Sequence, residues 1–264
     1  MAGIINVGTL ISGGGSNLQA IIDACKAGSI DARIVFTGSD TPGVKGLERA
    51  QKEGIDTFVV DYSQIIQSCK KGITPEDLPP DFEYDDILKK QQLINPPSTV
   101  LEPVNTESSD IKSPDIKLSG NDALKDQTRF FLESRAIAEK KLLDHILAYD
   151  IDLLVLAGFM RVLTPYFIDR LNIEPGQYRI MNIHPALLPS FPGTDGYGDT
   201  FRYGCKLAGC TVHFIDYGED TGPIIGQKAF DIEEDDTLDD IRRKGLEQEW
   251  KLYPACIQKF AESI

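Results

Sequence analysis

Long apolar runs, clustered cysteines or histidines, and an excess of positive charge are all missing from this sequence. No apolar run reaches the roughly 18 residues that a membrane-spanning helix needs, so we expect no membrane partner. The five cysteines are dispersed without a Cys-x-x-Cys pair, which favours reduced thiols over a disulfide framework. The three histidines stand in no HxxxH or HxxE context, so we expect no metal site.

The charge balance narrows the partners further. A formal net charge of -14 argues against nucleic acid or an anionic membrane as a bulk partner. A phosphorylated small molecule could bind only where backbone N–H groups offset the negative charge of the protein. The first residues lack the basic segment of a signal peptide and have the pattern of a strand, which predicts a cytoplasmic location.

The order of apolar segments indicates an α/β fold. Strands alternate with helices, which predicts an open, mostly parallel twisted sheet of Rossmann-like type with helices on both faces. Strands are expected at 4–11, 32–38, 57–61, 152–158, 179–184, 210–215 and 227–232. Helices are expected at 16–26, 42–53, 129–147, 165–171 and 238–252, with a second C-terminal helix after Pro254. Thr237 and Asp240 predict an N-cap for the helix that begins at 238. The strand at 152–158 is the most apolar and should be central.

One long segment interrupts this pattern. Seven of the fifteen prolines lie between residues 68 and 128, and residues 70–126 hold twelve acids against seven lysines. We therefore expect a single domain over 1–264 with a Pro-rich acidic surface insertion at 68–128, extended or partly disordered. The alternative is an ordered flap over a neighbouring subunit, which would make the protein a homodimer.

Two polar side chains end the strand at 179–184. Side chains alternate faces along a strand, so Asn182 and His184 should point the same way. An amide donor beside an imidazole could stabilise a carbonyl oxygen as it becomes an oxyanion. No nucleophile accompanies them, which suggests direct attack by a substrate amine. The alternative is a strand-end histidine that only bonds to backbone.

A carboxylate follows about forty residues later. Asp220 lies in the loop 217–223 after what we take to be a parallel strand, and such carboxyl-end loops hold ligands in open α/β sheets. A carboxylate there could hold the imidazole protonated or position a water. Turn formation alone would also explain an aspartate and a glycine at this place. His213, in mid-strand, should be a hydrogen-bonded core residue or should support the site through another side chain.

A glycine turn precedes the first helix. The turn 12–15 followed by Ser16 and Asn17 predicts an anion site at a helix N-terminus. The alternatives are a turn without a ligand and a dinucleotide site, because Gly13-x-Gly15 begins a GxGxxG pattern and Asp40 ends the second strand. Leu18 occupies the sixth position of that pattern, which weakens it. The missing lysine after the glycines excludes a P-loop.

Taken together, these motifs resemble those of the folate-dependent phosphoribosylglycinamide formyltransferases. The resemblance rests on four blocks and covers 4–64 and 129–260, everything except the insertion. The blocks are ISGGGSNLQ at 11–19, LAGFMR at 156–161, MNIHPALLP at 181–189 and DTGP at 220–223. It implies transfer of a formyl group from 10-formyltetrahydrofolate to the glycine amine of glycinamide ribonucleotide, in purine biosynthesis and without a metal.

The resemblance also implies roles for individual residues. The catalytic residues would be Asn182 and His184, which stabilise the oxyanion, and Asp220, which supports His184 and the proton transfer. Gly15, Ser16 and Asn17 would hold the ribonucleotide phosphate, and Glu249 its glycine amine. The folate would contact Arg135, Met160, Arg161, Val162, Leu163 and Asn182.

The chain departs from the family at one place close to these residues. Residues 192–199 lack the histidines that are common in the family after its Pro-Gly pair. The alternatives are a formyltetrahydrofolate hydrolase, which usually carries a further N-terminal domain, and another folate-dependent N-formyltransferase such as an amino-sugar enzyme. From a different class, a binding protein without catalysis or a dinucleotide-dependent oxidoreductase would bind nicotinamide.

Overall fold

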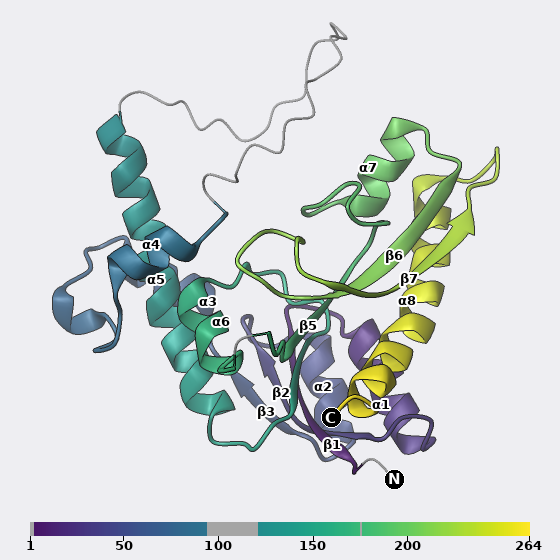
Figure 1. The fold of residues 1–264 in the computed structure, drawn as a ribbon, viewed down its shortest axis with the longest axis horizontal. Coiled ribbons are helices and arrows are strands. Elements are labelled where there is room, and N and C mark those ends of the chain that lie inside the picture. Colours follow the sequence, from purple (N-terminus) through teal and green to yellow (C-terminus); the bar gives the residue numbers. More distant parts are fainter. Residues whose placement is uncertain (1–2, 94–120, 175) are drawn as a thin grey trace, which may run out of the picture.

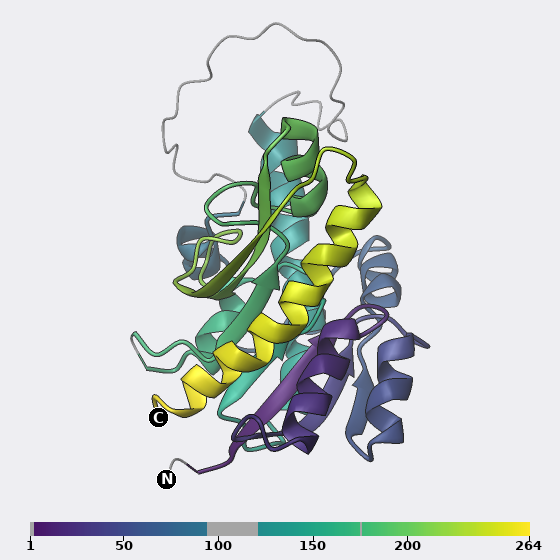
Figure 2. The same cartoon turned by 90° about the vertical axis from the view of Figure 1, so that its right-hand side faces the viewer.

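A computed structural model describes residues 3–93, 121–174 and 176–264, and it contains a mixed sheet between two layers of helices (Figures 1 and 2). The sheet of the described residues has seven strands in the order β3-β2-β1-β4-β5-β6-β7. The strands are β1 (Ile5–Ile11), β2 (Ala32–Ser39), β3 (Asp56–Val59), β4 (Leu153–Leu156), β5 (Ile180–His184), β6 (Leu207–Phe214) and β7 (Ile224–Asp231).

The sheet is parallel up to β5 and antiparallel beyond it. The neighbours β1–β2, β2–β3, β1–β4 and β4–β5 pair in parallel, whereas β6 runs antiparallel to β5 and β7 antiparallel to β6. The α/β class and the mostly parallel sheet are therefore confirmed.

The helices cover both faces of this sheet. One core packs α1 (Ser16–Lys26), α2 (Lys45–Lys52) and α8 (Leu238–Ala261) on the sheet, and the opposite core packs α3 (Tyr62–Cys69), α5 (Asn121–Ile146) and α6 (Pro165–Leu171). Figure 1 shows these two groups on opposite sides of the strands. No helix of the described residues is long and apolar enough to cross a membrane.

Strand β4 explains why a continuous apolar run marks the centre of such a sheet. All four of its residues are buried, with Leu153 and Val155 in the core under α8 and Leu154 and Leu156 in the core under α5. Both faces of a doubly covered strand must be apolar. By the same alternation, Met181 and Ile183 of β5 point toward the first core, which leaves Asn182 and His184 on the opposite face.

The segment expected to be a surface insertion is partly helical where it is described. The short turn η1 (Pro75–Asp77) and the helix α4 (Tyr84–Lys90) lie in it, and α5 already begins at Asn121. Ile87 is buried in the core under α5, and Lys90 Nζ lies 2.8 Å from Asp169 Oδ2 of α6. The expectation of extended chain is thus wrong for 84–90, because one buried side chain and ion pairs hold that helix. Residues 94–120 lie outside the described residues.

The C-terminal region differs from expectation as well. Instead of two helices separated at Pro254, α8 continues through this proline to Ala261. The interruption costs an intrahelical hydrogen bond, about 3 kcal/mol. The buried residues Tyr253, Cys256 and Ile257 hold both halves of α8 on the sheet, and this packing outweighs that loss. The expected cap is confirmed, since Thr237 and Asp240 form a capping box at the N-terminus of α8.

Candidate active site

The site is built at the end of β5, on the face opposite α8. Asn182 pairs in register with Leu156 of β4 and with His213 of β6. His184, two residues on, is buried with 3% of its surface exposed. The structure therefore brings Asn182 and His184 to the same face, as the alternation of β5 predicts.

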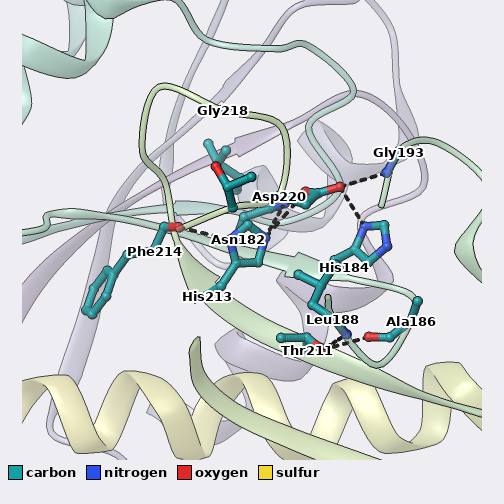
Figure 3. Close-up of polar contacts among 12 residues, drawn as sticks. Asn182, His184, Ala186, Leu188, Gly193, Thr211, His213, Phe214, Gly218 and Asp220 are labelled. Atoms are coloured by element: carbon teal, nitrogen blue, oxygen red, sulfur yellow. Dashed lines mark hydrogen bonds and ion pairs between the residues drawn. The ribbon is translucent and has the colours of Figure 1, made fainter. Parts of the chain in front are cut away.

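Asp220 reaches His184 from the loop between β6 and β7. Its Oδ2 lies 3.1 Å from His184 Nδ1 and accepts the Gly193 N–H at 2.9 Å, and its Oδ1 lies 3.5 Å from His213 Nε2. Figure 3 shows the carboxylate between these groups. Burial alone would raise the pKa of Asp220, but the hydrogen bonds from His213 and Gly193 and the charge of His184 outweigh burial and leave the pKa below its usual value.

The loop arrives by a different route from the one expected. We expected Asp220 to follow a parallel strand, but β6 runs antiparallel to β5, and its end at Phe214 pairs with Met181 near the start of β5. The loop must therefore fold back along β5 to bring Asp220 to His184. Gly222 allows this, because a Cβ there would lie 1.9 Å from the Phe214 carbonyl oxygen.

The second ring nitrogen of His184 also faces an oxygen. Nε2 lies 2.7 Å from the carbonyl oxygen of Phe191. A ring that donates to both Phe191 and Asp220 must carry hydrogen on both nitrogens. Among the residues that the structure describes, Phe191 and Asp220 are the only non-glycine residues with positive φ, at 54° and 55°. Backbone strain of this kind often collects at functional sites.

His213 supports the site from β6. It is fully buried, its Nδ1 lies 2.9 Å from the Phe214 carbonyl oxygen, and its Nε2 lies 3.4 Å from Asn182 Nδ2. The prediction that His213 is a hydrogen-bonded residue supporting other side chains is confirmed by these contacts. Its Nε2 thus lies near both the amide nitrogen of Asn182 and the carboxylate of Asp220.

An open cavity lies beside these groups. It is lined by the end of β5, by Gly193 and Thr194, by parts of the loop 215–220, and by residues 158–163 after β4. Met160 and Val162 are exposed while Leu163 is buried, so this wall presents apolar side chains to a ligand. Arg161 lines the cavity too, but its guanidinium pairs with the buried Asp40.

Arg135 lies apart from this cavity. Its guanidinium carbon is 5.4 Å from the ring centres of both Tyr62 and Phe131, and burial lowers its pKa. It is absent from the cavity lining in the described part of the chain. Glu139, one turn further on α5, accepts the Thr164 N–H at 2.8 Å, and burial raises its pKa to about 7. Arg135 thus belongs to a buried polar cluster beneath the wall formed by 158–163.

The glycine turn forms the expected helix N-terminus. Gly15 has φ 68°, and the first intrahelical bond runs from the Gln19 N–H to the Gly15 carbonyl oxygen at 2.9 Å. The N–H groups of Ser16, Asn17 and Leu18 precede that bond and are available to an anion. The turn adjoins the cavity wall, since Ser12 Oγ accepts the Met160 N–H at 2.8 Å.

Glu249 lies close to this helix end and not in the cavity lining. It is buried, with 5% of its surface exposed, although it lies on α8. Its Oε2 accepts a hydrogen bond from Asn17 Nδ2 at 2.7 Å and its Oε1 one from Tyr197 Oη at 2.8 Å. The side chain of Asn17 is therefore engaged with Glu249, which leaves only its backbone N–H for an anion.

Three contacts of this site were not anticipated from the sequence. Tyr197 lies on α7 (Gly196–Tyr203), a helix whose two glycines have the pattern of a loop. The carbonyl oxygen of Phe191 and the N–H of Gly193 are backbone groups without a motif of their own. Only the Pro-Gly pair at 192–193 marked a turn there. Asp40, which the dinucleotide alternative would use, is buried against Arg161 and does not face a ligand.

Comparison with known proteins places this geometry in a family. The family model described as formyl transferase matches residues 5–257. A glycinamide ribonucleotide transformylase structure from Symbiobacterium toebii has 32% identity and a TM-score of 0.65, with 98% of this chain and 89% of that chain covered. The phosphoribosylglycinamide formyltransferase of Escherichia coli is 29% identical over 98% of this chain and 88% of its own length.

Other relatives align over smaller shares of their length. The phosphoribosylglycinamide formyltransferase of Bacillus subtilis is 44% identical over 48% of this chain, and that alignment spans 63% of the relative. The trifunctional purine biosynthetic protein adenosine-3 of Drosophila melanogaster is 31% identical over 95% of this chain, which spans 13% of that protein. The resemblance drawn from the sequence motifs is confirmed, and the chain belongs to the formyl transferase family.

Proposed function

We propose that this protein transfers the formyl group of 10-formyltetrahydrofolate to the glycine amine of glycinamide ribonucleotide, a step of purine biosynthesis. The observation that supports this most is the contact of His184 with Asp220 at 3.1 Å, beside Asn182 and at the edge of an open cavity. Relatives that match almost the whole chain carry the name of this activity.

The reaction needs no covalent enzyme intermediate. Neither serine nor cysteine is among the described residues that line the cavity. The neutral amine of the ribonucleotide attacks the formyl carbon, and the carbonyl oxygen takes up the negative charge. A proton then moves from the attacking amine nitrogen to the folate nitrogen, and the bond between the folate nitrogen and the formyl carbon breaks.

Asn182 and His184 donate to the oxygen as its charge develops. Each such donor is worth about 3 to 4 kcal/mol in comparable sites. In the structure, Nε2 of His184 already contacts the Phe191 carbonyl oxygen. Donation to the substrate therefore requires this hydrogen to be shared, or the backbone at 191–193 to shift when substrates bind. Asp220 keeps His184 oriented and holds a water for the proton transfer.

The two substrates would enter from different sides. The folate ring system fits the wall of Met160, Arg161, Val162 and Leu163, where exposed apolar side chains and backbone groups meet. The ribonucleotide phosphate fits the N–H groups at the start of α1, and Glu249 contacts Asn17 at that end. A direct contact of Arg135 with folate, which the resemblance implied, would need a movement of its buried guanidinium.

The assay that tests this function follows one cosubstrate. Purified protein is incubated with 10-formyltetrahydrofolate, with and without glycinamide ribonucleotide, and the release of tetrahydrofolate is measured. We expect release only when the ribonucleotide is present. Equal release without it would instead show a hydrolase, and release with an amino sugar as the only acceptor would show a different N-formyltransferase. Binding of a nicotinamide dinucleotide in place of folate would contradict all of these folate-dependent functions.

The phosphate site can be tested at Gly15. A Cβ at this residue would lie 2.7 Å from Gly46 Cα, in a backbone conformation that costs a non-glycine residue about 1 to 2 kcal/mol. We expect Gly15→Ala to raise the KM for the ribonucleotide and to leave the KM for the folate unchanged. Gly28→Ala is the matched control, because φ is 63° there and nothing lies within 4 Å of the added methyl. Equal effects of the two substitutions would contradict the site.

Two further expectations belong to this proposal. A cytoplasmic location, drawn from the sequence, stays a prediction that cell fractionation can check. The homodimer, also drawn from the sequence as an alternative for the insertion at 68–128, stays a prediction, and the mass of the protein in solution would decide it.

A further inference from the structure

Three buried polar side chains from three helices meet outside the catalytic cavity. Glu249 of α8 accepts hydrogen bonds from Asn17 of α1 at 2.7 Å and from Tyr197 of α7 at 2.8 Å. All three side chains are buried, with 5% to 7% of their surface exposed. Figure 2 shows α8 running alongside α1, with α7 near its upper end. Each helix thus contributes one member of a buried hydrogen-bonded group.

The donors and acceptors of this group are fixed. Burial, followed by the charge of Glu249, raises the pKa of Tyr197 well above its usual range, so its hydroxyl keeps its hydrogen and donates. The Asn17 amide nitrogen can only donate. The carboxylate of Glu249 therefore accepts on both oxygens and cannot rotate without breaking a buried hydrogen bond.

The position of the Tyr197 ring depends on two glycines. A Cβ at Gly245 of α8 would lie 2.1 Å from Tyr197 Cζ, so only glycine leaves room for the ring. A Cβ at Gly196 would lie 2.6 Å from the Pro185 carbonyl oxygen. The N-terminus of α7 thus packs against Pro185, which follows His184, and the ring of Tyr197 packs against Gly245 of α8.

Tyr197 lies in the segment 192–199, where this sequence departs from its family. We propose that Tyr197 is a positioning residue for substrate recognition, which holds the Glu249 carboxylate beside the N-terminus of α1 to accept hydrogen bonds from a phosphorylated glycosyl amine. This inference rests on the proposed function, because it takes the ribonucleotide as the ligand at that end of α1. It assigns Tyr197 of this segment a part in binding the acceptor and none in binding the folate.

The test compares two tyrosines of the same helix. Tyr197→Phe removes the hydroxyl and keeps the ring, and Tyr203→Phe makes the same change at a side chain that is 79% exposed. We expect the Kd for glycinamide ribonucleotide, measured by calorimetry without folate, to rise about tenfold in Tyr197→Phe. The KM of Tyr197→Phe for the ribonucleotide should rise in parallel, while its KM for 10-formyltetrahydrofolate stays unchanged. The Tyr203→Phe variant should keep the wild-type Kd and KM values.

A double-mutant cycle separates positioning from a general loss of structure. If Tyr197 acts through the carboxylate, Tyr197→Phe should add little to the Kd change in the Glu249→Gln background. Additive changes, or a lowered Tm with the ribonucleotide Kd unchanged, would overturn the inference. If Tyr197→Phe is too unstable to measure, Gly245→Ala tests the same contact. It displaces the Tyr197 ring and should also raise the Kd for glycinamide ribonucleotide.

The outcomes distinguish this inference from the proposed function. A wild-type protein that binds the ribonucleotide without transferring formyl would refute the function, and the Tyr197→Phe comparison of Kd would still decide the inference. A wild-type protein that transfers formyl, with the Tyr197→Phe variant unchanged, would refute only the inference. A wild-type protein that does not bind the ribonucleotide would refute both.

Discussion

Replacing His184 by alanine is expected to lower kcat by about 10³, because one oxyanion donor is lost from a buried site. The substitution also leaves the Asp220 carboxylate without its contact at 3.1 Å and frees the Phe191 carbonyl oxygen. Single-turnover kinetics with both substrates saturating would measure the chemical step. The Kd values for ribonucleotide and folate should change much less, since the donor acts mainly on the charge that develops in the transition state.

The matched control for this variant is His145→Ala. His145 is exposed on α5 and stacks on Phe58, with ring centres 4.5 Å apart, well away from the cavity lining. It should retain the full rate. A His184→Ala variant with the wild-type rate would refute the mechanism while leaving the assignment of the fold intact.

Replacing Asp220 by asparagine should lower kcat by about 10² to 10³, since the amide keeps the shape but removes the charge beside the imidazole. The matched control is Asp216→Asn, which makes the same change in the same loop. Asp216 also lines the cavity but bonds to the Gly218 N–H and Thr221 Oγ1 of its own loop. We expect the control to keep most of the rate, and similar losses in both variants would argue that loop order, and not the Asp220 charge, is required.

The stability of Asp220→Asn should depend less on pH than the stability of the wild type. The pKa of Asp220 is lowered in the folded protein, so its contribution to the free energy of unfolding is present above the ordinary carboxyl pKa and is lost as pH falls through the lowered value. Between about pH 5 and pH 2, Asp220→Asn should therefore lose less stability than the wild type. Urea unfolding across this range measures it, and parallel curves would show that the carboxylate gains nothing from its partners.

The parts of this structure that follow from the sequence are those set by periodicity and by short contiguous motifs. The apolar run of β4 predicts a central strand because both faces of that strand are buried. Alternation along β5 predicts that Asn182 and His184 share a face. The glycine turn predicts the N-terminus of α1, and the Thr237 and Asp240 pair predicts the cap of α8.

The parts that do not follow depend on contacts between distant residues. Nothing in the local pattern shows that Glu249 faces Asn17 and Tyr197, because these three residues meet only when three helices pack. Packing also overrides the helix-breaking tendency of Pro254. The Phe191 carbonyl oxygen reaches His184 through a backbone conformation that a phenylalanine rarely adopts, so no residue preference points to it.

The two strained positions at 191 and 220 have a consequence for how this protein tolerates change. A left-handed backbone at a bulky residue costs about 1 to 2 kcal/mol, and glycine would remove that cost. Both positions place an oxygen against the imidazole of His184, so a change of backbone at either one would lengthen a contact of that ring. Glycine at either position should therefore raise the free energy of unfolding but lower the rate of the proposed reaction. We expect substitutions that raise the Tm without loss of activity to lie elsewhere in the chain.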